Sequence, residues 1–174
     1  MSKEILVKTR NGIVRTRHRP TWAEIDLKAI AYNYRQVKRL VGKAVKVMVV
    51  VKANAYGHGT VEISATLEKL GVDYLGVATT DEAMRLRDHG IKSPILILGS
   101  VLPEEVKPAI EKDVTLTLCS YELLEAIKKE TQDRFRAKVH IEIDTGMGRI
   151  GIWHEEAIKF IKNIAQEKCI FIEG

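Results

Sequence analysis

A single lysine, Lys52, stands at the end of an apolar run and directly before a glycine-punctuated loop, in the stretch VVVKANAYGHG at residues 49–59. A charged amine is costly to bury unless it is paired, neutralised or used chemically. An ordinary lysine here would extend its amine to solvent along its aliphatic stem. The alternative is an amine held partly away from water, which is a nucleophile suited to forming a Schiff base with a carbonyl compound.

The loop after Lys52 favours the chemical interpretation. Tyr56 lies four residues further on, and Gly57 and Gly59 let the backbone approach a ligand closely. A phenol hydroxyl beside the free N–H groups of a helix start can bind a phosphate. An amine next to a phosphate site predicts pyridoxal 5′-phosphate, because its aldehyde needs the amine and its tail needs the phosphate site.

A second candidate group lies in the stretch IEIDTGMGRIG, residues 141–151. Residues 144–148 are predicted to form a tight turn at a strand end, from which Arg149 projects. Its guanidinium is either an ordinary surface charge or suited to a bidentate grip on a carboxylate. Glu142 alternates with two isoleucines and is expected to face inward. Pairing with Arg149 would neutralise Glu142 and hold the guanidinium still.

Other polar residues carry weaker signals, and no metal site is predicted. His58 is expected to be a loop or capping residue, and His140 is expected on the helix-facing side of its strand. The DTG triplet at Asp144 matches aspartic proteases over only three residues, in a βα context that does not suit them. Cys119 and Cys169 are too far apart for a zinc or redox motif and fit a reducing cytosol.

The elements that must position these residues alternate between strand and helix patterns. Gly42, Gly71 and Gly90 are predicted helix stops, and Thr79 and Glu82 have the spacing of a capping box. Alternation of this kind predicts a parallel sheet buried on both faces. The predicted strands are the apolar, β-branched runs 45–51, 74–79, 94–99, 114–118, 138–144 and 169–172.

Two α/β architectures remain open, a doubly wound sheet and a parallel (β/α)8 TIM-type barrel. Both place function at the carboxyl ends of the strands, where Lys52 and Arg149 are expected. No G-x-G-x-x-G sequence follows the first strand, which argues against a dinucleotide site.

Composition and charge narrow the class of protein. The 174 residues are 45% hydrophobic and 29% charged, as in a single globular domain. Residues 1–19 carry six basic residues and one acidic residue, which accounts for the whole net charge of +5. We therefore expect a flexible basic leader at residues 1–18, a folded unit at 19–174, and no nucleic-acid interface. A membrane span and a signal peptide are not expected, so the predicted location is cytoplasmic.

The two motifs VKANAYGHG and DTGMGRIG resemble the N-terminal signatures of the alanine racemases, and YLGVATTDEAMRLRDHGIKSPILILG between them is also similar to that family. The resemblance extends from about Arg19 to Gly174. It implies a (β/α)8 barrel that uses pyridoxal 5′-phosphate to interconvert L-alanine and D-alanine, which supplies D-alanine for peptidoglycan.

The resemblance also implies roles for individual residues. Lys52 matches the lysine that holds the cofactor covalently and acts as the base for the D-enantiomer. Tyr56 matches a tyrosine that hydrogen-bonds the cofactor phosphate. Arg149 matches an arginine that contacts the substrate carboxylate and the cofactor's phenolic oxygen. Glu142 stands where some relatives have a carbamylated lysine, so it would supply a carboxylate directly, and Glu142→Gln is expected to weaken activity by loosening Arg149.

Family members are about twice as long, with eight barrel strands, a β-rich second domain and a homodimer interface. The opposite-face base of the family, a tyrosine, comes from that second domain. The present sequence offers six strands and no counterpart of that base. It is therefore expected to be a truncated chain or one piece of a split enzyme, which folds poorly and is inactive alone.

Three other functions fit the same residues. A non-catalytic pyridoxal-phosphate carrier would need only Lys52 and the phosphate site. A Schiff-base aldolase would use Lys52 without a cofactor. A racemase of another amino acid would differ only in the pocket for the side chain.

Overall fold

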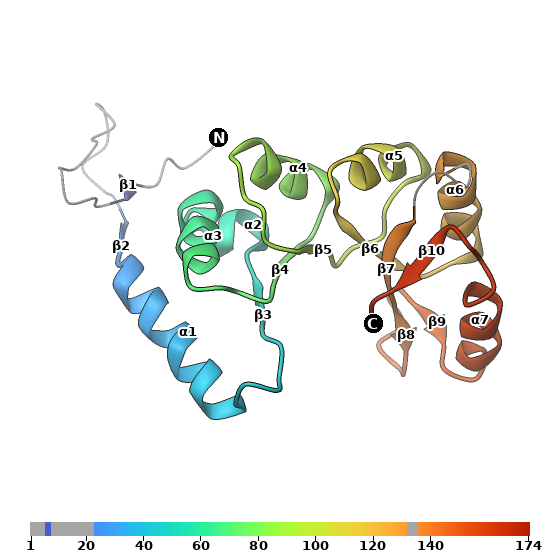
Figure 1. Cartoon of the computed structure of the whole chain (residues 1–174), viewed down its shortest axis with the longest axis horizontal. Coiled ribbons are helices and arrows are strands. Elements are labelled where there is room, and N and C mark those ends of the chain that lie inside the picture. Colours follow the sequence, from blue (N-terminus) through green and yellow to red (C-terminus); the bar gives the residue numbers. More distant parts are fainter. Residues whose placement is uncertain (1–5, 8–22, 132–135) are drawn as a thin grey trace.

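The computed structural model describes residues 6–7, 23–131 and 136–174 (Figure 1). Six strands form one parallel sheet, and their spatial order is their order along the chain. Each strand falls within or at the edge of one of the six predicted runs, so these predictions are confirmed. The strands are β3 (Met48–Val50), β4 (Tyr74–Val77), β5 (Ile95–Ile97), β6 (Thr115–Leu118), β7 (Ala137–Ile141) and β10 (Ile170–Ile172).

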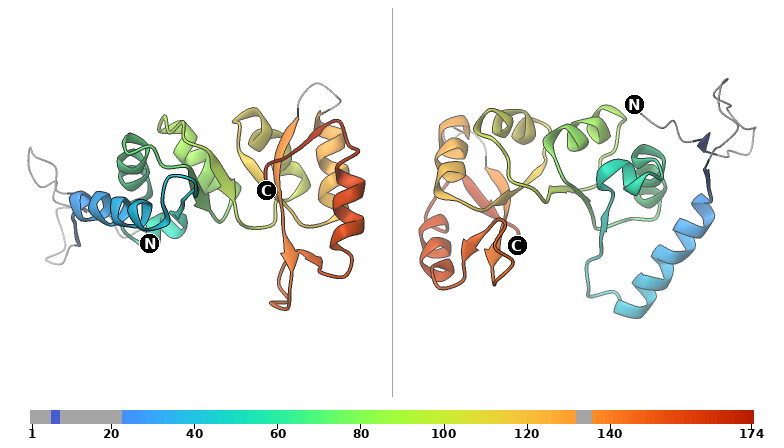
Figure 2. Two further views of the ribbon diagram at one scale, coloured as in Figure 1. Left: turned by 60° about the horizontal axis from the view of Figure 1, so that its bottom comes forward. Right: turned by 180° about the vertical axis from the view of Figure 1, so that it is seen from behind.

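The helices between these strands lie along one face of the sheet (Figures 1 and 2). A doubly wound sheet reverses its strand order at a switch point and carries helices on both faces, and neither feature is seen in the described residues. The winding is therefore that of a (β/α) barrel, of which this sheet forms six strands. The helices are α3 (Thr60–Lys69), α4 (Thr80–Asp88), α5 (Pro103–Glu111), α6 (Tyr121–Thr131) and α7 (Ala157–Ile164).

A hydrogen bond across the inner face shows that the sheet curls. Tyr74 at the start of β4 donates its hydroxyl to Glu173 Oε2, 2.6 Å away and just beyond β10. Thr115 of β6 donates to the same oxygen at 2.9 Å. In a flat sheet the four steps from β4 to β10 would separate these strands by about 19 Å. The two side chains can meet only because the inner face is concave.

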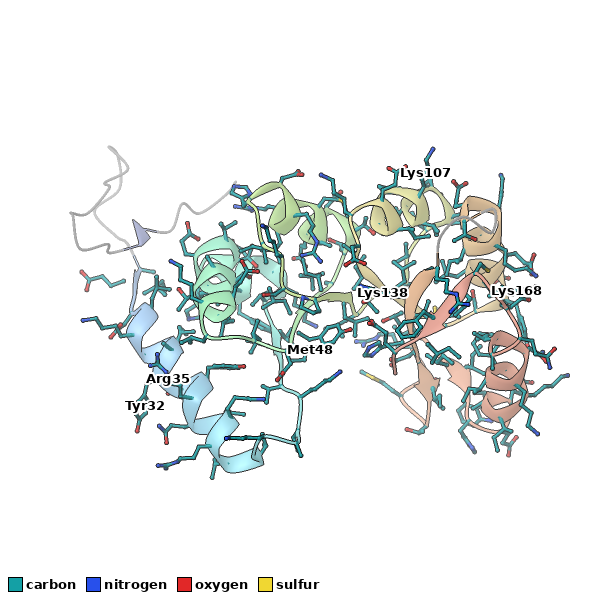
Figure 3. The ribbon with its side chains drawn as sticks, viewed as in Figure 1. Tyr32, Arg35, Met48, Lys107, Lys138 and Lys168 are labelled. Atoms are coloured by element: carbon teal, nitrogen blue, oxygen red, sulfur yellow. The ribbon has the colours of Figure 1, made fainter. Side chains whose placement is uncertain are left out.

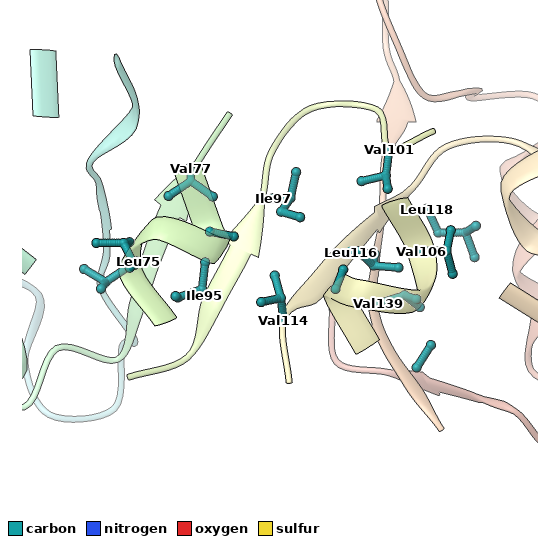
Figure 4. Packing of buried hydrophobic residues seen from close by; sticks show 14 of the residues in the cluster. Leu75, Val77, Ile95, Ile97, Val101, Val106, Val114, Leu116, Leu118 and Val139 are labelled. Carbon is teal, nitrogen blue, oxygen red and sulfur yellow. The ribbon is translucent and has the colours of Figure 1, made fainter. Parts of the chain in front are cut away.

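The hydrophobic core fills the space between the sheet and its helices (Figure 4). Alternate residues of the strands point to this side, so Leu75 and Val77 of β4, and Leu116 and Leu118 of β6, are fully buried. The opposite, inner face carries polar residues. His140 lies there, with its ring 5.7 Å from that of Tyr74. The prediction that His140 faces the helices was wrong, because the buried side of β7 is taken by its neighbour Val139.

The first long helix begins at a capping residue and ends at Gly42, which was predicted as a helix stop. In α1 (Leu27–Val41), the Asp26 carboxylate accepts the Lys28 N–H at 2.8 Å, and the helix ends at Gly42 with φ 80°. The helix packs beside α3, and Tyr32 and Arg35 point away from the sheet (Figure 3).

The last helix buries one narrow row of apolar residues. In α7, Ala157, Phe160 and Ile164 are buried, as a helix that buries positions i, i+3 and i+7 requires. Ile158, on another side of the helix, is 68% exposed.

One arginine side chain forms hydrogen bonds to the loops that lead into β5 and β6. Arg87 at the end of α4 donates to the carbonyl oxygens of Ile91, Ser93, Lys112 and Asp113, at 2.8–3.0 Å. These carbonyls precede β5 and β6, so one half-buried guanidinium holds two successive βα units together.

The predicted basic leader lies mostly outside the described residues. Two of its residues form β1 (Leu6–Val7), which pairs in parallel with β2 (Glu24–Ile25). The prediction that residues 1–18 are flexible stays a prediction. Within the described residues, no helix combines the length and the apolar character needed to cross a bilayer.

Candidate active site at the carboxyl ends of the strands

Lys52 lies directly after the first strand of the sheet. Val51 continues β3 and donates its N–H to the Gly76 carbonyl at 2.8 Å, which fixes the backbone against β4. Val51 is buried, and Lys52 is half-buried. Among the described residues the Lys52 amine has no hydrogen-bond or ion-pair partner. A half-buried amine without a counter-ion is open to a ligand.

The chain leaves Lys52 through a left-handed turn. The next four residues, Ala53, Asn54, Ala55 and Tyr56, have φ between 51° and 54°, although none of them is glycine. The left-handed conformation costs L-residues roughly 1–2 kcal/mol each. Strain of this size persists only where the surroundings impose it, and it is concentrated at functional sites. The short helix α2 (Lys52–Tyr56) consists largely of this turn.

Hydrogen bonds hold the far end of the turn to the start of α3. The Asn54 side-chain oxygen accepts the Thr60 N–H at 3.1 Å, and Thr60 Oγ1 donates to the Val51 carbonyl at 2.7 Å. His58 Nδ1 lies 2.9 Å from the Ala55 carbonyl, so the prediction that His58 is a loop residue is confirmed. The loop is therefore a closed unit attached to both β3 and α3.

Tyr56 is the last residue of the turn and is 61% exposed. Its hydroxyl has no partner among the described residues, so it is available to a ligand. Gly57 and Gly59 follow with φ of 90° and 95°, a region that favours glycine. The first N–H of α3, that of Thr60, is already bonded to Asn54. A phosphate would rely on the Tyr56 hydroxyl and on the later N–H groups of this helix start.

Arg149 lies in a loop that is folded around one carboxylate. Asp144 accepts the N–H of Gly146 at 2.8 Å and that of Gly148 at 2.9 Å. These bonds, that of Gly146 first, hold the pKa of Asp144 below its ordinary value. The predicted tight turn at residues 144–148 is therefore present. Arg149 is exposed, and among the described residues its guanidinium has no partner.

A small two-stranded sheet closes this loop. β8 (Ile143–Asp144) pairs in parallel with β9 (Ile152–Trp153), and Ile152 donates to the Glu142 carbonyl at 2.9 Å. Gly151, with φ 111°, passes so close that an added Cβ would lie 3.0 Å from Glu142 Cγ. Glu142 is exposed and forms no ion pair with Arg149 in the part of the chain that the structure describes. Their pairing stays a prediction.

The Lys52 loop and the Arg149 loop lie at the same end of the sheet, where the parallel strands have their carboxyl ends. Lys52 follows β3 and Arg149 follows β7, and both strands run in parallel, so both residues belong to the carboxyl ends. A cavity of about 480 Å³ on the inner face is lined by residues of β3, β4, β7 and the β10 end, and Lys52, Tyr56 and Arg149 are not among them. The residues expected to do chemistry therefore lie in the loops and do not line this cavity.

The sequence model described as "Alanine racemase, N-terminal domain" matches residues 25–174. The chain belongs to the alanine racemase family. The chain is 47% identical over 158 residues to alanine racemase 1 of Caldanaerobacter subterraneus subsp. tengcongensis, and 45% identical over 157 residues to the alanine racemase of Methanococcus maripaludis. These matches cover 90% and 89% of the chain but only 41% and 42% of the relatives. The chain thus spans about two fifths of the length of these curated relatives.

Solved structures agree with this assignment. The alanine racemase of Clostridium difficile 630 superimposes with a TM-score of 0.86 at 40% identity, covering 91% of this chain and 42% of that one. The same enzyme has been solved in complex with cycloserine. The alanine racemase of Bacillus anthracis with bound L-Ala-P superimposes with a TM-score of 0.82 at 38% identity, covering 92% of this chain and 42% of that one. The prediction of family and fold is confirmed.

Proposed function

We propose that this chain carries the cofactor-binding part of a racemase that interconverts L-alanine and D-alanine with pyridoxal 5′-phosphate. The observation that carries the proposal is the half-buried Lys52 amine, which has no partner among the described residues and is held at a strained turn at the carboxyl end of β3. Membership of the alanine racemase family supports the substrate.

The three candidate residues fit the groups of this cofactor. A primary amine, a phenol and a guanidinium, each unpaired among the described residues, match an aldehyde, a phosphate and a phenolic or carboxylate oxygen. When bound, the cofactor supplies an electron sink that makes the α-proton of an amino acid acidic.

Each residue then has a defined task. Lys52 would hold the cofactor through its amine, and the same amine could add or remove the α-proton of the substrate on one face. Tyr56 donates its hydroxyl to the phosphate. Arg149 grips the substrate carboxylate, and Glu142 steadies that guanidinium by its negative charge. The Asp144 turn keeps Arg149 at the mouth of the barrel.

The wider setting is also part of the proposal. A complete enzyme of this kind is a cytoplasmic homodimer that acts on a free amino acid and supplies D-alanine for peptidoglycan, without nucleic-acid or membrane partners. The balanced charge after residue 19 supports the last point.

The proposal is tested by a spectroscopic titration with pyridoxal 5′-phosphate. The protein without substitutions is expected to develop the yellow absorption band of a covalently bound cofactor. Lys52→Met should abolish the band. The matched control Lys46→Met, at the exposed start of the same strand region, should leave it unchanged.

Other outcomes of the titration would contradict the proposal. A band that survives Lys52→Met would refute the role of Lys52. A protein that borohydride reduction links to a carbonyl substrate in the absence of cofactor would be an aldolase instead. A yellow protein whose complete form fails to exchange the α-proton of alanine in deuterated water would be a carrier or a racemase of another amino acid.

A further inference from the structure

Glu82 accepts backbone hydrogen bonds from two different loops at this edge of the sheet. Its Oε1 accepts the Ala53 N–H at 2.6 Å, and its Oε2 accepts the Ala78 N–H at 2.8 Å. Ala53 directly follows Lys52, and Ala78 directly follows β4. One carboxylate therefore ties the lysine loop to the end of the neighbouring strand.

This arrangement departs from the local pattern of the helix start. Glu82 lies three residues after Thr79, the N-cap of α4, and Thr79 Oγ1 accepts the Glu82 N–H at 3.3 Å. In a complete capping box the glutamate side chain would return to the N–H of Thr79. Here the side chain bonds Ala78 and reaches 29 positions back along the chain to Ala53.

Ala78, which bonds Glu82 at the end of β4, lies in a closely packed part of the backbone. A Cβ added to Gly99 would collide with the Ala78 carbonyl oxygen, so this glycine packs directly on the backbone after β4. The neighbouring Leu98 donates its N–H to the Val77 carbonyl at 2.8 Å. Ala78 is thus held both by the residues around β5 and by Glu82. Because Glu82 also bonds Ala53, its carboxylate fixes the position of Ala53 relative to the end of β4.

The bonds within the left-handed turn leave the Ala53 N–H free for Glu82. Ala55 donates to the Val51 carbonyl at 2.9 Å, and Gly57 donates to the Ala53 carbonyl at 3.1 Å. Among the described residues, the Ala53 N–H has Glu82 as its partner. This bond acts on the peptide next to Lys52, where the backbone enters its strained stretch.

We propose that Glu82 is a positioning residue for Lys52, which fixes the start of the left-handed turn and so the direction in which the amine leaves the sheet. The inference rests on the proposed function, because it takes Lys52 as the residue that captures the cofactor. A charged acceptor gives stronger bonds to N–H groups than a neutral one, and both carboxylate oxygens are used.

The test compares Glu82→Gln with the control Asp81→Asn, which removes the same charge from the exposed neighbouring position of α4. A glutamine offers one oxygen and turns an NH2 group toward the other N–H, so one of the two bonds is lost. Two quantities are measured on the full-length protein, the hydrogen exchange of single amides and the affinity for pyridoxal 5′-phosphate.

In Glu82→Gln, the exchange of the Ala53 or Ala78 amide should accelerate about tenfold or more, while that of Leu116 in the core stays unchanged. Cofactor affinity should fall about tenfold. Asp81→Asn should match the unchanged protein within about twofold. If Glu82→Gln does not fold, Glu82→Asp replaces it, because the shorter side chain keeps the charge but cannot reach both amides.

Unchanged exchange at Ala53 and Ala78, or faster exchange there with unchanged cofactor affinity, would overturn the inference and leave the proposed function intact. Acceleration that includes the Leu116 amide equally would show a general loss of stability and would also overturn it. If the protein without any substitution binds no cofactor, the proposed function is wrong, and this inference fails with it.

Discussion

Replacing Ala53 by glycine tests the strain in the turn after Lys52. Ala53 is exposed, so its methyl group contributes little to packing, and its φ of 51° is unfavourable for alanine. Glycine removes roughly 1 kcal/mol of this strain, but it also gives the unfolded chain more freedom, which costs about 0.5–1 kcal/mol. The two effects nearly cancel, so Ala53→Gly should be neutral or stabilise the protein by up to about 0.5 kcal/mol.

The matched control is Ala29→Gly, at an exposed position of the right-handed helix α1. There glycine relieves no strain and should destabilise the protein by up to about 1 kcal/mol. In a protein of this size, 1 kcal/mol corresponds to roughly 2–4 °C in Tm. Urea titrations and thermal melts of the two variants should therefore differ in sign or clearly in size. An Ala53→Gly variant that loses as much stability as Ala29→Gly would refute the strained turn.

Three further changes test the fold. Leu116→Ala should lower the free energy of unfolding by about 2–5 kcal/mol in urea, because the side chain is fully buried in β6; a loss below about 1 kcal/mol would contradict that packing. Burial, followed by the hydrogen bond to Glu173, raises the pKa of Tyr74 to about 12. Its contribution to stability is complete below about pH 10 and is lost as the pH rises from there to about 12, so Tyr74→Phe should flatten alkaline unfolding followed by circular dichroism. An unchanged alkaline curve would argue against the bond across the inner face. The hydrogen bond from Lys38 lowers the pKa of Asp73, so its contribution is present above about pH 4 and is lost as the pH falls through that lowered pKa. Asp73→Asn should therefore make stability less sensitive to acid, and an equal loss of unfolding free energy between neutral and acid pH in both proteins would contradict this.

The order of elements could be predicted from sequence because most of them turn an apolar face toward the core. Strand runs such as residues 114–118 are apolar and β-branched, and helix ends are marked by glycine or by a cap such as Ser120, whose Oγ accepts the Leu123 N–H at 3.2 Å. These signals are local. The choice between a barrel and a doubly wound sheet is not local. From the sequence it rested on the resemblance to the alanine racemases, and in the structure it follows from the strand order and from the contact between Tyr74 and Glu173.

The direction of a single polar side chain was harder to predict. His140 and Glu142 are separated by two positions in one apolar stretch, so the alternation that placed Glu142 inward should have placed His140 inward as well. The structure confirms this for His140, which contacts Tyr74 on the inner face. In α7, apolar residues occur on more than one side, and the sequence pattern did not show that Phe160 rather than Ile158 would be buried.

The residue types of the candidate site could be predicted from sequence, but the contacts and the backbone conformation that hold them in place could not. Lys52, Tyr56 and Arg149 stand in motifs whose composition is unusual for ordinary loops. Glu82 was recognised only for its capping-box spacing, because a local pattern cannot show that its carboxylate reaches Ala53. The left-handed turn was also missed, since Ala53–Tyr56 contains none of the glycines that usually announce positive φ.

The most direct test of the account is to find the atom to which the cofactor is attached. The protein is incubated with pyridoxal 5′-phosphate, reduced with borohydride, digested and mapped by mass spectrometry. The account predicts a pyridoxyl group on the peptide that contains Lys52, in clear excess over exposed lysines such as Lys69. Label spread evenly over exposed lysines, or concentrated at any residue other than Lys52, would contradict it.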